Sequence, residues 1–266
     1  MDAREFLGVA PTHNPHRWVL PVTLGIATGG NFLFGGCALG AAIIALETAT
    51  ARPVVWATAQ YLSFANIGET MDLDVIIASE GRYTTQARVI GAVGDREVVT
   101  LNAALGERPV KYETSYAVRP DVPPPAKCPE RSNRWALPGS LMERLDMRLA
   151  KGRQWNDLSA GNGQSDGTSA LWVRMPRIDM SAAALAVLGD YVPYGIAQAV
   201  GEWTQANSLD NTIRVVQIVP TDWVLLDIRI QGIRNGFGHG LVHLWAEDGT
   251  LLATASQSAI VREPKD

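Results

Sequence analysis

The chain has 266 residues, enough for one large domain or two small ones, and its 47% hydrophobic and 19% charged residues are typical of a folded globular protein rather than a disordered or fibrous one. The formal net charge of −4, with no cluster of Lys or Arg, argues against nucleic acid or an anionic membrane as the main partner. The start carries no basic region followed by an apolar stretch, and the longest apolar run is shorter than the roughly 20 residues that span a bilayer, so we expect a cytoplasmic protein.

The first element that the sequence predicts is a helix over Gly35–Glu47 with almost no polar face. A helix that is apolar all round must be buried all round, and a sheet that curls about it is the economical way to bury it. Four strand-like runs rich in Val, Ile, Thr and Tyr follow, separated by glycine-containing turns. They cover residues 53–64, 71–78, 83–91 and 97–105. This half is therefore predicted to be a helix followed by an antiparallel meander.

The proline-rich stretch at 111–140 is predicted to be a linker between an N-terminal unit, residues 1–110, and a C-terminal unit, residues 141–266. In the second unit, residues 181–200 form another apolar helical segment, with Ser181 as its N-cap and a kink at Pro193. Strand-like runs follow at 208–219, 223–231, 238–246 and 250–261. Their turns fall about 154 residues after those of the first unit, which indicates an internal duplication; the alternative is that two α+β units share these spacings by chance.

Short motifs spread over nearly the whole chain carry a family resemblance. They are Phe34-Gly35-Gly36, Gly81-Arg82, Arg88-Val89, Leu171-Trp172-Val173-Arg174, Ser208-Leu209-Asp210, Trp223-Val224-Leu225-Leu226, Asp248-Gly249-Thr250-Leu251 and Ala255-Ser256-Gln257 with Arg262. In this order they resemble the double-hotdog acyl-CoA thioesterases, the type II or medium-chain group. The resemblance implies an α+β double hotdog, in which two fused units each wrap an antiparallel sheet around a long buried helix.

The sequence departs from this family at several positions. Cys37 stands where the family usually has Gln, no His lies near residues 58–61, and Ser258-Ala259 follow the glutamine where Glu-Gly is common. The resemblance also places Gln231 where the best-known members have a Ser or Thr that joins the catalytic Asp and Gln. We therefore expect Gln231 to act as a water-orienting donor in place of that hydroxyl.

Asp210 and Gln257 are the catalytic candidates that the resemblance implies, and only the second unit carries this acid–amide pair. As a general base, Asp210 would take a proton from water while that water attacks a thioester carbonyl. Gln257 has apolar neighbours, and a buried amide must find partners, which orientation of the attacking water would supply. The alternatives are an aspartate bonded to nearby backbone and a glutamine in a structural cross-strand bond.

Gly35, Gly36 and Cys37, at the start of the first helix, are the expected substrate-binding residues. Glycine allows a ligand close to the backbone, and free N–H groups at a helix N-terminus can polarise a thioester oxygen. The alternative is simple packing of helix against sheet. Because this helix lies in the other unit from Asp210, the two hotdogs would have to share one cleft.

Three further polar residues, His239, His243 and Asp190, lie in predicted strands or helices. His239 and His243 project from one face of a predicted strand, but no carboxylate or Cys falls at a supporting position for a metal, so we expect solvated or cross-strand histidines. Asp190 lies within the second apolar helix and is a buried acid with a possible function. A tertiary hydrogen bond or a subunit contact is the expected role for it.

The resulting hypothesis is an acyl-CoA thioesterase that releases free acid and CoA, uses no metal or redox cofactor, and binds neither nucleic acid nor membrane. Exposed edges of hotdog sheets often pair between subunits, so a homodimer or higher homo-oligomer is expected. Two alternatives stay open. One is an enoyl-thioester hydratase, which would ordinarily need an Asp–His pair that is not visible here; the other is a non-catalytic module that binds acyl thioesters or lipids.

Overall fold

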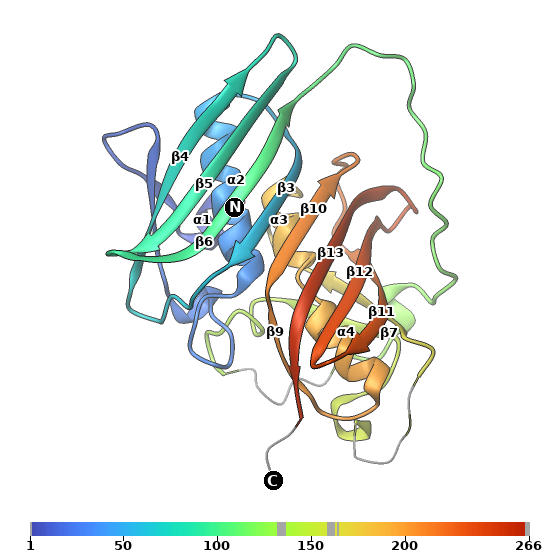
Figure 1. The fold of residues 1–266 in the computed structure, drawn as a ribbon. Coiled ribbons are helices and arrows are strands. Elements are labelled where there is room, and N and C mark those ends of the chain that lie inside the picture. The colour runs from blue at the N-terminus through green and yellow to red at the C-terminus, as the bar shows by residue number, and fades with distance from the viewer. Residues whose placement is uncertain (1, 132–136, 159–162, 164, 264–266) are drawn as a thin grey trace.

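The N-terminal half wraps a sheet around one long helix (Figure 1). The computed structural model describes residues 2–131, 137–158, 163 and 165–263. The helix, α2, runs over Gly35–Thr50, and most of its residues are buried, as its lack of a polar face predicted. The four predicted strands are also present: β3 Val54–Tyr61, β4 Thr70–Glu80, β5 Thr84–Val93 and β6 Arg96–Gly106. The elements before α2 were not predicted: α1 Ala3–Leu7, β1 Ala10–Pro11, β2 Arg17–Pro21 and the 3-10 turn η1 Leu24–Ile26.

The C-terminal half repeats this plan with a divided helix. The four predicted runs appear as strands, the first of them split in two: β9 Gln205–Ser208, β10 Asp210–Val215, β11 Val224–Arg234, β12 Phe237–Ala246 and β13 Leu251–Arg262. Two further strands precede the helices, β7 Asp146–Lys151 and β8 Thr168–Arg174, with the 3-10 turns η2 Pro125–Lys127 and η3 Trp155–Asp157. Between β6 and η2 the chain is extended, without helix or strand.

The second helical segment is broken into α3 Ala182–Leu188 and α4 Val192–Val200. Ser181 caps α3 as predicted, since its Oγ accepts a hydrogen bond from the N–H of Ala184 at 3.2 Å. Pro193 lies in the first turn of α4, where its missing N–H is tolerated, but its ring is incompatible with an α-helix continuing from the preceding turn. The segment 182–200 is long and apolar enough to cross a membrane, but 78% of it is buried inside the fold, so it is a core element.

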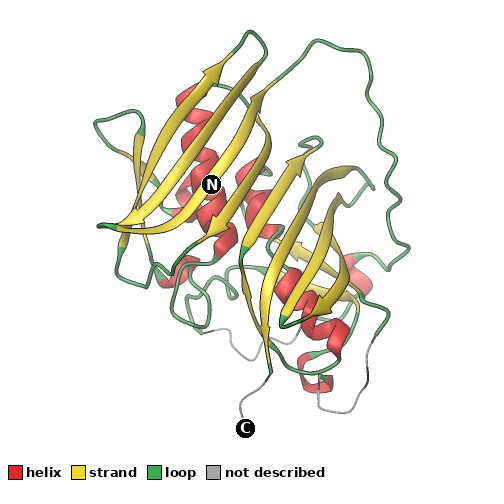
Figure 2. Ribbon diagram, in the orientation of Figure 1, coloured by secondary structure: helices red, strands yellow, loops and turns green. Residues whose placement is uncertain are grey.

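One continuous antiparallel sheet joins the two halves, and the helices cover one side of it (Figure 2). Its strand order is β1-β2-β4-β5-β6-β3-β10-β13-β12-β11-β8-β7, with β9 paired to β13. At the junction, Thr58 of β3 lies opposite Thr212 of β10, and their hydroxyls are 2.6 Å apart. These residues are 154 positions apart, which is the offset of the predicted duplication, so the halves are related by an approximate twofold axis near this pair. The fold is the α+β double hotdog.

Glycines bring α2 unusually close to α3. A Cβ atom on Gly36 would lie 2.8 Å from the carbonyl oxygen of Ala186, and one on Gly40 would lie 2.9 Å from that of Ala183. Both distances are shorter than a real Cβ contact, so only glycine permits this helix spacing. As a consequence, the N-terminus of α2 lies against the break between α3 and α4.

Candidate active site

The helix break positions Asp190 at the N-terminus of α2. The carboxylate is buried, with 5% of the residue exposed, and its Oδ2 accepts a hydrogen bond from the backbone N–H of Gly36 at 2.6 Å. A helix N-terminus favours a negative charge because its first N–H groups have no partner within the helix. The close packing of α2 on α3 therefore sets the position of this acid.

Gln257 and Ser208 complete a polar network around Asp190. Gln257, on β13 and 2% exposed, donates from Nε2 to Asp190 Oδ1 and, at 3.1 Å, to Ser208 Oγ. Its Oε1 accepts from the N–H of Val192 at 3.0 Å, which makes the amide nitrogen face the carboxylate. Ser208 Oγ lies 3.5 Å from Asp190 Oδ1. A carboxylate, an amide and a hydroxyl thus converge from three separate segments.

The environment of Asp190 brings its pKa close to neutrality. Burial raises the pKa to about 6, although the hydrogen bonds from Gln257, Gly36 and Ser208 act in the opposite direction. The charge of Asp190 in turn adds to the effect of burial in raising the pKa of Tyr61 and Tyr191. A carboxylate that titrates near pH 6 and is ionised at pH 7 suits a general base.

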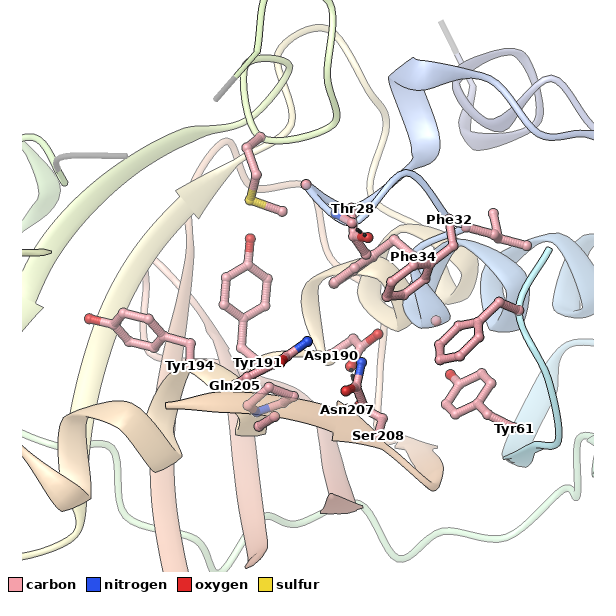
Figure 3. A pocket seen from close by; sticks show the side chains of 18 of the residues that line it. Thr28, Phe32, Phe34, Tyr61, Asp190, Tyr191, Tyr194, Gln205, Asn207 and Ser208 are labelled. Atoms are coloured by element: carbon pink, nitrogen blue, oxygen red, sulfur yellow. Dashed lines mark hydrogen bonds between the residues drawn. The ribbon is translucent and has the colours of Figure 1, made fainter. Parts of the chain in front are cut away.

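Asp190 and Ser208 line a cavity of about 530 Å³, within the size range of small-molecule sites. Figure 3 shows Phe34 and Tyr61 on one side of Asp190, and Tyr191 and Tyr194 on the other. Both halves of the chain contribute to the wall, which is mainly apolar and aromatic. The carboxylate therefore lies where an apolar ligand would bring a reactive group.

The three residues expected at the start of the first helix lie around this network. Gly35 lines the cavity, and a Cβ atom there would lie 2.8 Å from both Asp190 Oδ2 and the ring of Tyr61. Gly36 donates its N–H to Asp190, so that group is occupied. Cys37 is fully buried and is not among the described lining residues, and burial raises the pKa of its thiol.

The structure pairs Gln257 with Asp190 and not with Asp210. Asp210 Oδ1 accepts a hydrogen bond from the backbone N–H of Ser258 at 2.8 Å, the structural alternative considered above. Thr212 lies opposite Ser256, so Asp210, two residues from Thr212, shares their face of the sheet. Gln257 follows Ser256 directly and therefore points to the other face, toward the helices.

Gln231 lies apart from this network. It is exposed and falls at a register shift between Ile230 and Gly232, so it has no partner across β12. It is not among the described residues that line the cavity. The hydroxyl that contacts the acid and the amide belongs to Ser208.

Two signals in the sequence pointed toward the observed site. Asp190 is an acid within an otherwise apolar helical segment, and such a group is expected to have a specific partner. Gly36 and Asp190 are also 154 residues apart, so the approximate twofold axis brings a position and its repeat together. Ser208 belongs to the motif Ser208-Leu209-Asp210, but in that motif the acid and not the serine was the predicted catalytic residue.

The histidines make cross-strand contacts away from the cavity. His239 Nδ1 lies 3.1 Å from Ser258 Oγ, and His243 Nδ1 lies 3.8 Å from a carboxylate oxygen of Asp227. Within the described ranges, no three His, Cys, Asp or Glu side chains gather as metal ligands would.

Comparisons with known proteins agree with the fold. Residues 120–261 match the family described as acyl-CoA thioesterase C-terminal domain. A candidate thioesterase from Novosphingobium aromaticivorans is 30% identical, with a TM-score of 0.84 over 95% of this chain and 98% of that one. Among curated proteins, none is significantly similar in sequence.

Two more distant structures share the fold. A protein of unknown function with a hot dog fold from Alicyclobacillus acidocaldarius is 21% identical, with a TM-score of 0.86 over 99% of this chain and 98% of that one. An acyl-CoA thioesterase II from Mycobacterium marinum is 19% identical, with a TM-score of 0.76 over 99% of both chains.

Proposed function

Because the chain belongs to the acyl-CoA thioesterase family of hydrolases, we propose that it hydrolyses acyl-CoA thioesters to free acid and CoA with water activated by Asp190. The observation that supports this assignment is the buried carboxylate of Asp190, hydrogen-bonded to Gln257 and Gly36 at the wall of an apolar cavity. The sequence predicts catalytic roles for Asp210 and Gln231, but both lie outside this network, and the proposal assigns the reaction to Asp190 instead.

In the proposed reaction, Ser208 positions a water molecule beside Asp190, and Gln257 holds the carboxylate and this hydroxyl in place. The ionised carboxylate takes a proton from this water as the water oxygen bonds to the thioester carbon. The carbonyl oxygen becomes an oxyanion, and the N-terminal end of α2 at Gly35, with its partial positive charge, stabilises it. When the carbon–sulfur bond breaks, the electron pair leaves on sulfur, and Asp190 returns the proton to the CoA thiolate.

Thiol release from a panel of acyl-CoAs, from short to long acyl chains, tests the proposed activity. We expect steady turnover of at least part of the panel by the purified chain without added metal. An aromatic cavity of this size also predicts a maximum acyl length beyond which the rate falls. A chain that releases thiol from no member of the panel would refute the activity.

The pH dependence of the same reaction is expected to follow Asp190. Since burial raises its pKa to about 6, kcat/KM should fall about tenfold per pH unit below that value and reach a plateau above it. An aspartate with the ordinary pKa of about 3.9 would give a flat profile down to pH 5. Initial rates between pH 5 and 8 with a subsaturating acyl-CoA distinguish the two profiles.

We also propose that the chain forms a homo-oligomer, that its two units are bounded as predicted, and that it is cytoplasmic. The extended connection after β6 exposes Tyr112, Tyr116 and Val118 by 82, 90 and 80%. Large side chains exposed in succession favour contact with a second copy, in agreement with the predicted homo-oligomer. This connection lies between the proposed units 1–110 and 141–266.

A further inference from the structure

Arg131 is a second charged residue at the cavity that contains Asp190. These two are the charged side chains among the described residues that line it. Arg131 is half-buried, and its guanidinium lies over the ring of Tyr194, 4.6 Å from the ring centroid. One of its nitrogens, Nη1, lies 3.0 Å from the sulfur of Met147. A cation thus faces a largely aromatic cavity.

No carboxylate of the described residues forms an ion pair with Arg131. A guanidinium has five N–H donors, and the thioether sulfur of Met147 is a weak acceptor. Charged side chains taken out of water are normally paired, and arginine matches a carboxylate through two parallel hydrogen bonds. Arg131 therefore retains donors that an anionic group of a ligand can use.

Tyr191 is a neighbour of both Arg131 and Asp190. It follows Asp190 in the chain, and its hydroxyl lies 3.8 Å from the sulfur of Met147, the atom that Arg131 also contacts. The positive charge of Arg131 acts to lower the pKa of Tyr191, and the negative charge of Asp190 acts to raise it. Both charged groups are therefore close enough to Tyr191 to affect its hydroxyl. Arg131 thus contacts the same sulfur atom as the hydroxyl of Tyr191, and both Arg131 and Asp190 line the cavity. The phosphates of CoA lie beyond the pantetheine arm from the thioester, whereas Arg131 lines the same cavity as Asp190.

We propose that the acyl group bound at this site carries a second carboxylate, which Arg131 binds, so that the substrates are CoA monothioesters of short dicarboxylic acids. This inference rests on the proposed function and names its substrate class. Arg131 and Asp190 line the same cavity of about 530 Å³, so a short acyl group bound there can reach both side chains. The aromatic wall contacts the methylene groups, and the guanidinium selects the charged end.

Adipoyl-CoA and hexanoyl-CoA test this selection because they have equal carbon counts and differ in the terminal carboxylate. The wild type is expected to show a kcat/KM at least about tenfold higher for adipoyl-CoA. Arg131→Met should lower kcat/KM for adipoyl-CoA roughly 10–100-fold, while kcat/KM for hexanoyl-CoA should change less than about threefold. Arg131→Lys should recover part of the loss for adipoyl-CoA. If Arg131 had a general structural role, Arg131→Met would instead lower kcat/KM for both substrates to the same extent and also lower the melting temperature.

The corresponding thioesters of pantetheine, which lack the CoA phosphates, identify the anion. If the wild type prefers adipoyl-pantetheine over hexanoyl-pantetheine as strongly as it prefers adipoyl-CoA over hexanoyl-CoA, the anion that Arg131 binds is the acyl carboxylate. If Arg131→Met weakens both CoA substrates alike and the effect disappears with pantetheine thioesters, Arg131 binds a CoA phosphate and the inference is wrong. Turnover of hexanoyl-CoA without a preference for adipoyl-CoA would overturn the inference and leave the proposed function intact.

Binding measured by calorimetry on the Asp190→Asn variant tests the inference without turnover. Adipoyl-CoA is expected to bind at least about tenfold more tightly than hexanoyl-CoA, and adding Arg131→Met should remove this difference. Equal affinities in Asp190→Asn would refute the selection by Arg131 whether or not thiol release is observed. Lack of thiol release from the wild type, by contrast, would refute the proposed activity.

Discussion

Replacing Asp190 by Asn is expected to lower kcat for acyl-CoA hydrolysis by about 10²–10⁴-fold. The amide has nearly the same shape and can still accept the N–H of Gly36, but it cannot take a proton from water. Thiol release from the best acyl-CoA, measured at pH 8 where Asp190 is ionised, gives the loss directly.

Asp210→Asn is the matched control, because it makes the same chemical change at the other candidate acid. Asp210 accepts from the backbone N–H of Ser258, which an amide oxygen can also do, so activity should stay within about threefold of wild type. The opposite pattern, with Asp210→Asn inactive and Asp190→Asn active, would move the general base to Asp210.

Loss of folding is not expected to explain the effect of Asp190→Asn. The pKa of Asp190 is raised in the folded chain, so its neutral form is the one that folding favours. The corresponding contribution to stability is present at low pH and is lost as the pH rises through about 6. At pH 8 the neutral amide avoids this cost, but it keeps only one acceptor oxygen and so loses the hydrogen bond from Gln257 or the one from Gly36. Because the two effects oppose each other, the melting temperature should stay within a few degrees of that of wild type.

Replacing Gly36 by Ala is expected to have the second largest effect, on stability as well as on activity. The added methyl group would lie 2.8 Å from the carbonyl oxygen of Ala186 and 3.0 Å from the Cα of Val187, and backbone atoms cannot rotate away as a side chain does. Overpacking of this kind costs about 1–3 kcal/mol, equivalent to a fall of roughly 2–12 °C in melting temperature for a chain of this size.

The same methyl group would lie 3.0 Å from the Cβ of Asp190, so the acid would shift with the helix and kcat should fall as well. Gly232→Ala is the control, since a Cβ atom there has no neighbour within 4 Å. Thermal unfolding of the three proteins measures the difference. An unchanged melting temperature for Gly36→Ala would mean that α2 and α3 are not packed as closely as described.

Much of the fold could be predicted because its signals are local. The apolar run at the start of α2, the cap at Ser181 and the interruption at Pro193 each act through neighbours within a few residues. β7 and β8 were missed, because their pairing partners lie on β11 and on each other, and no nearby turn marks them as a hairpin. Local patterns do not encode such distant pairing.

The sequence by itself determined the two helix-and-sheet units, their offset of 154 residues and the buried position of Gln257, because periodicity and turn residues are properties of short segments. The tertiary structure alone decided which acid joins that glutamine. Asp190 is 67 residues from Gln257 along the chain, yet the helix break and the twofold arrangement bring them into contact. Asp210 is separated from Gln257 by the pleat of the sheet, since alternate side chains point to opposite faces. Strand register and helix packing, which depend on the whole chain, therefore determine the site.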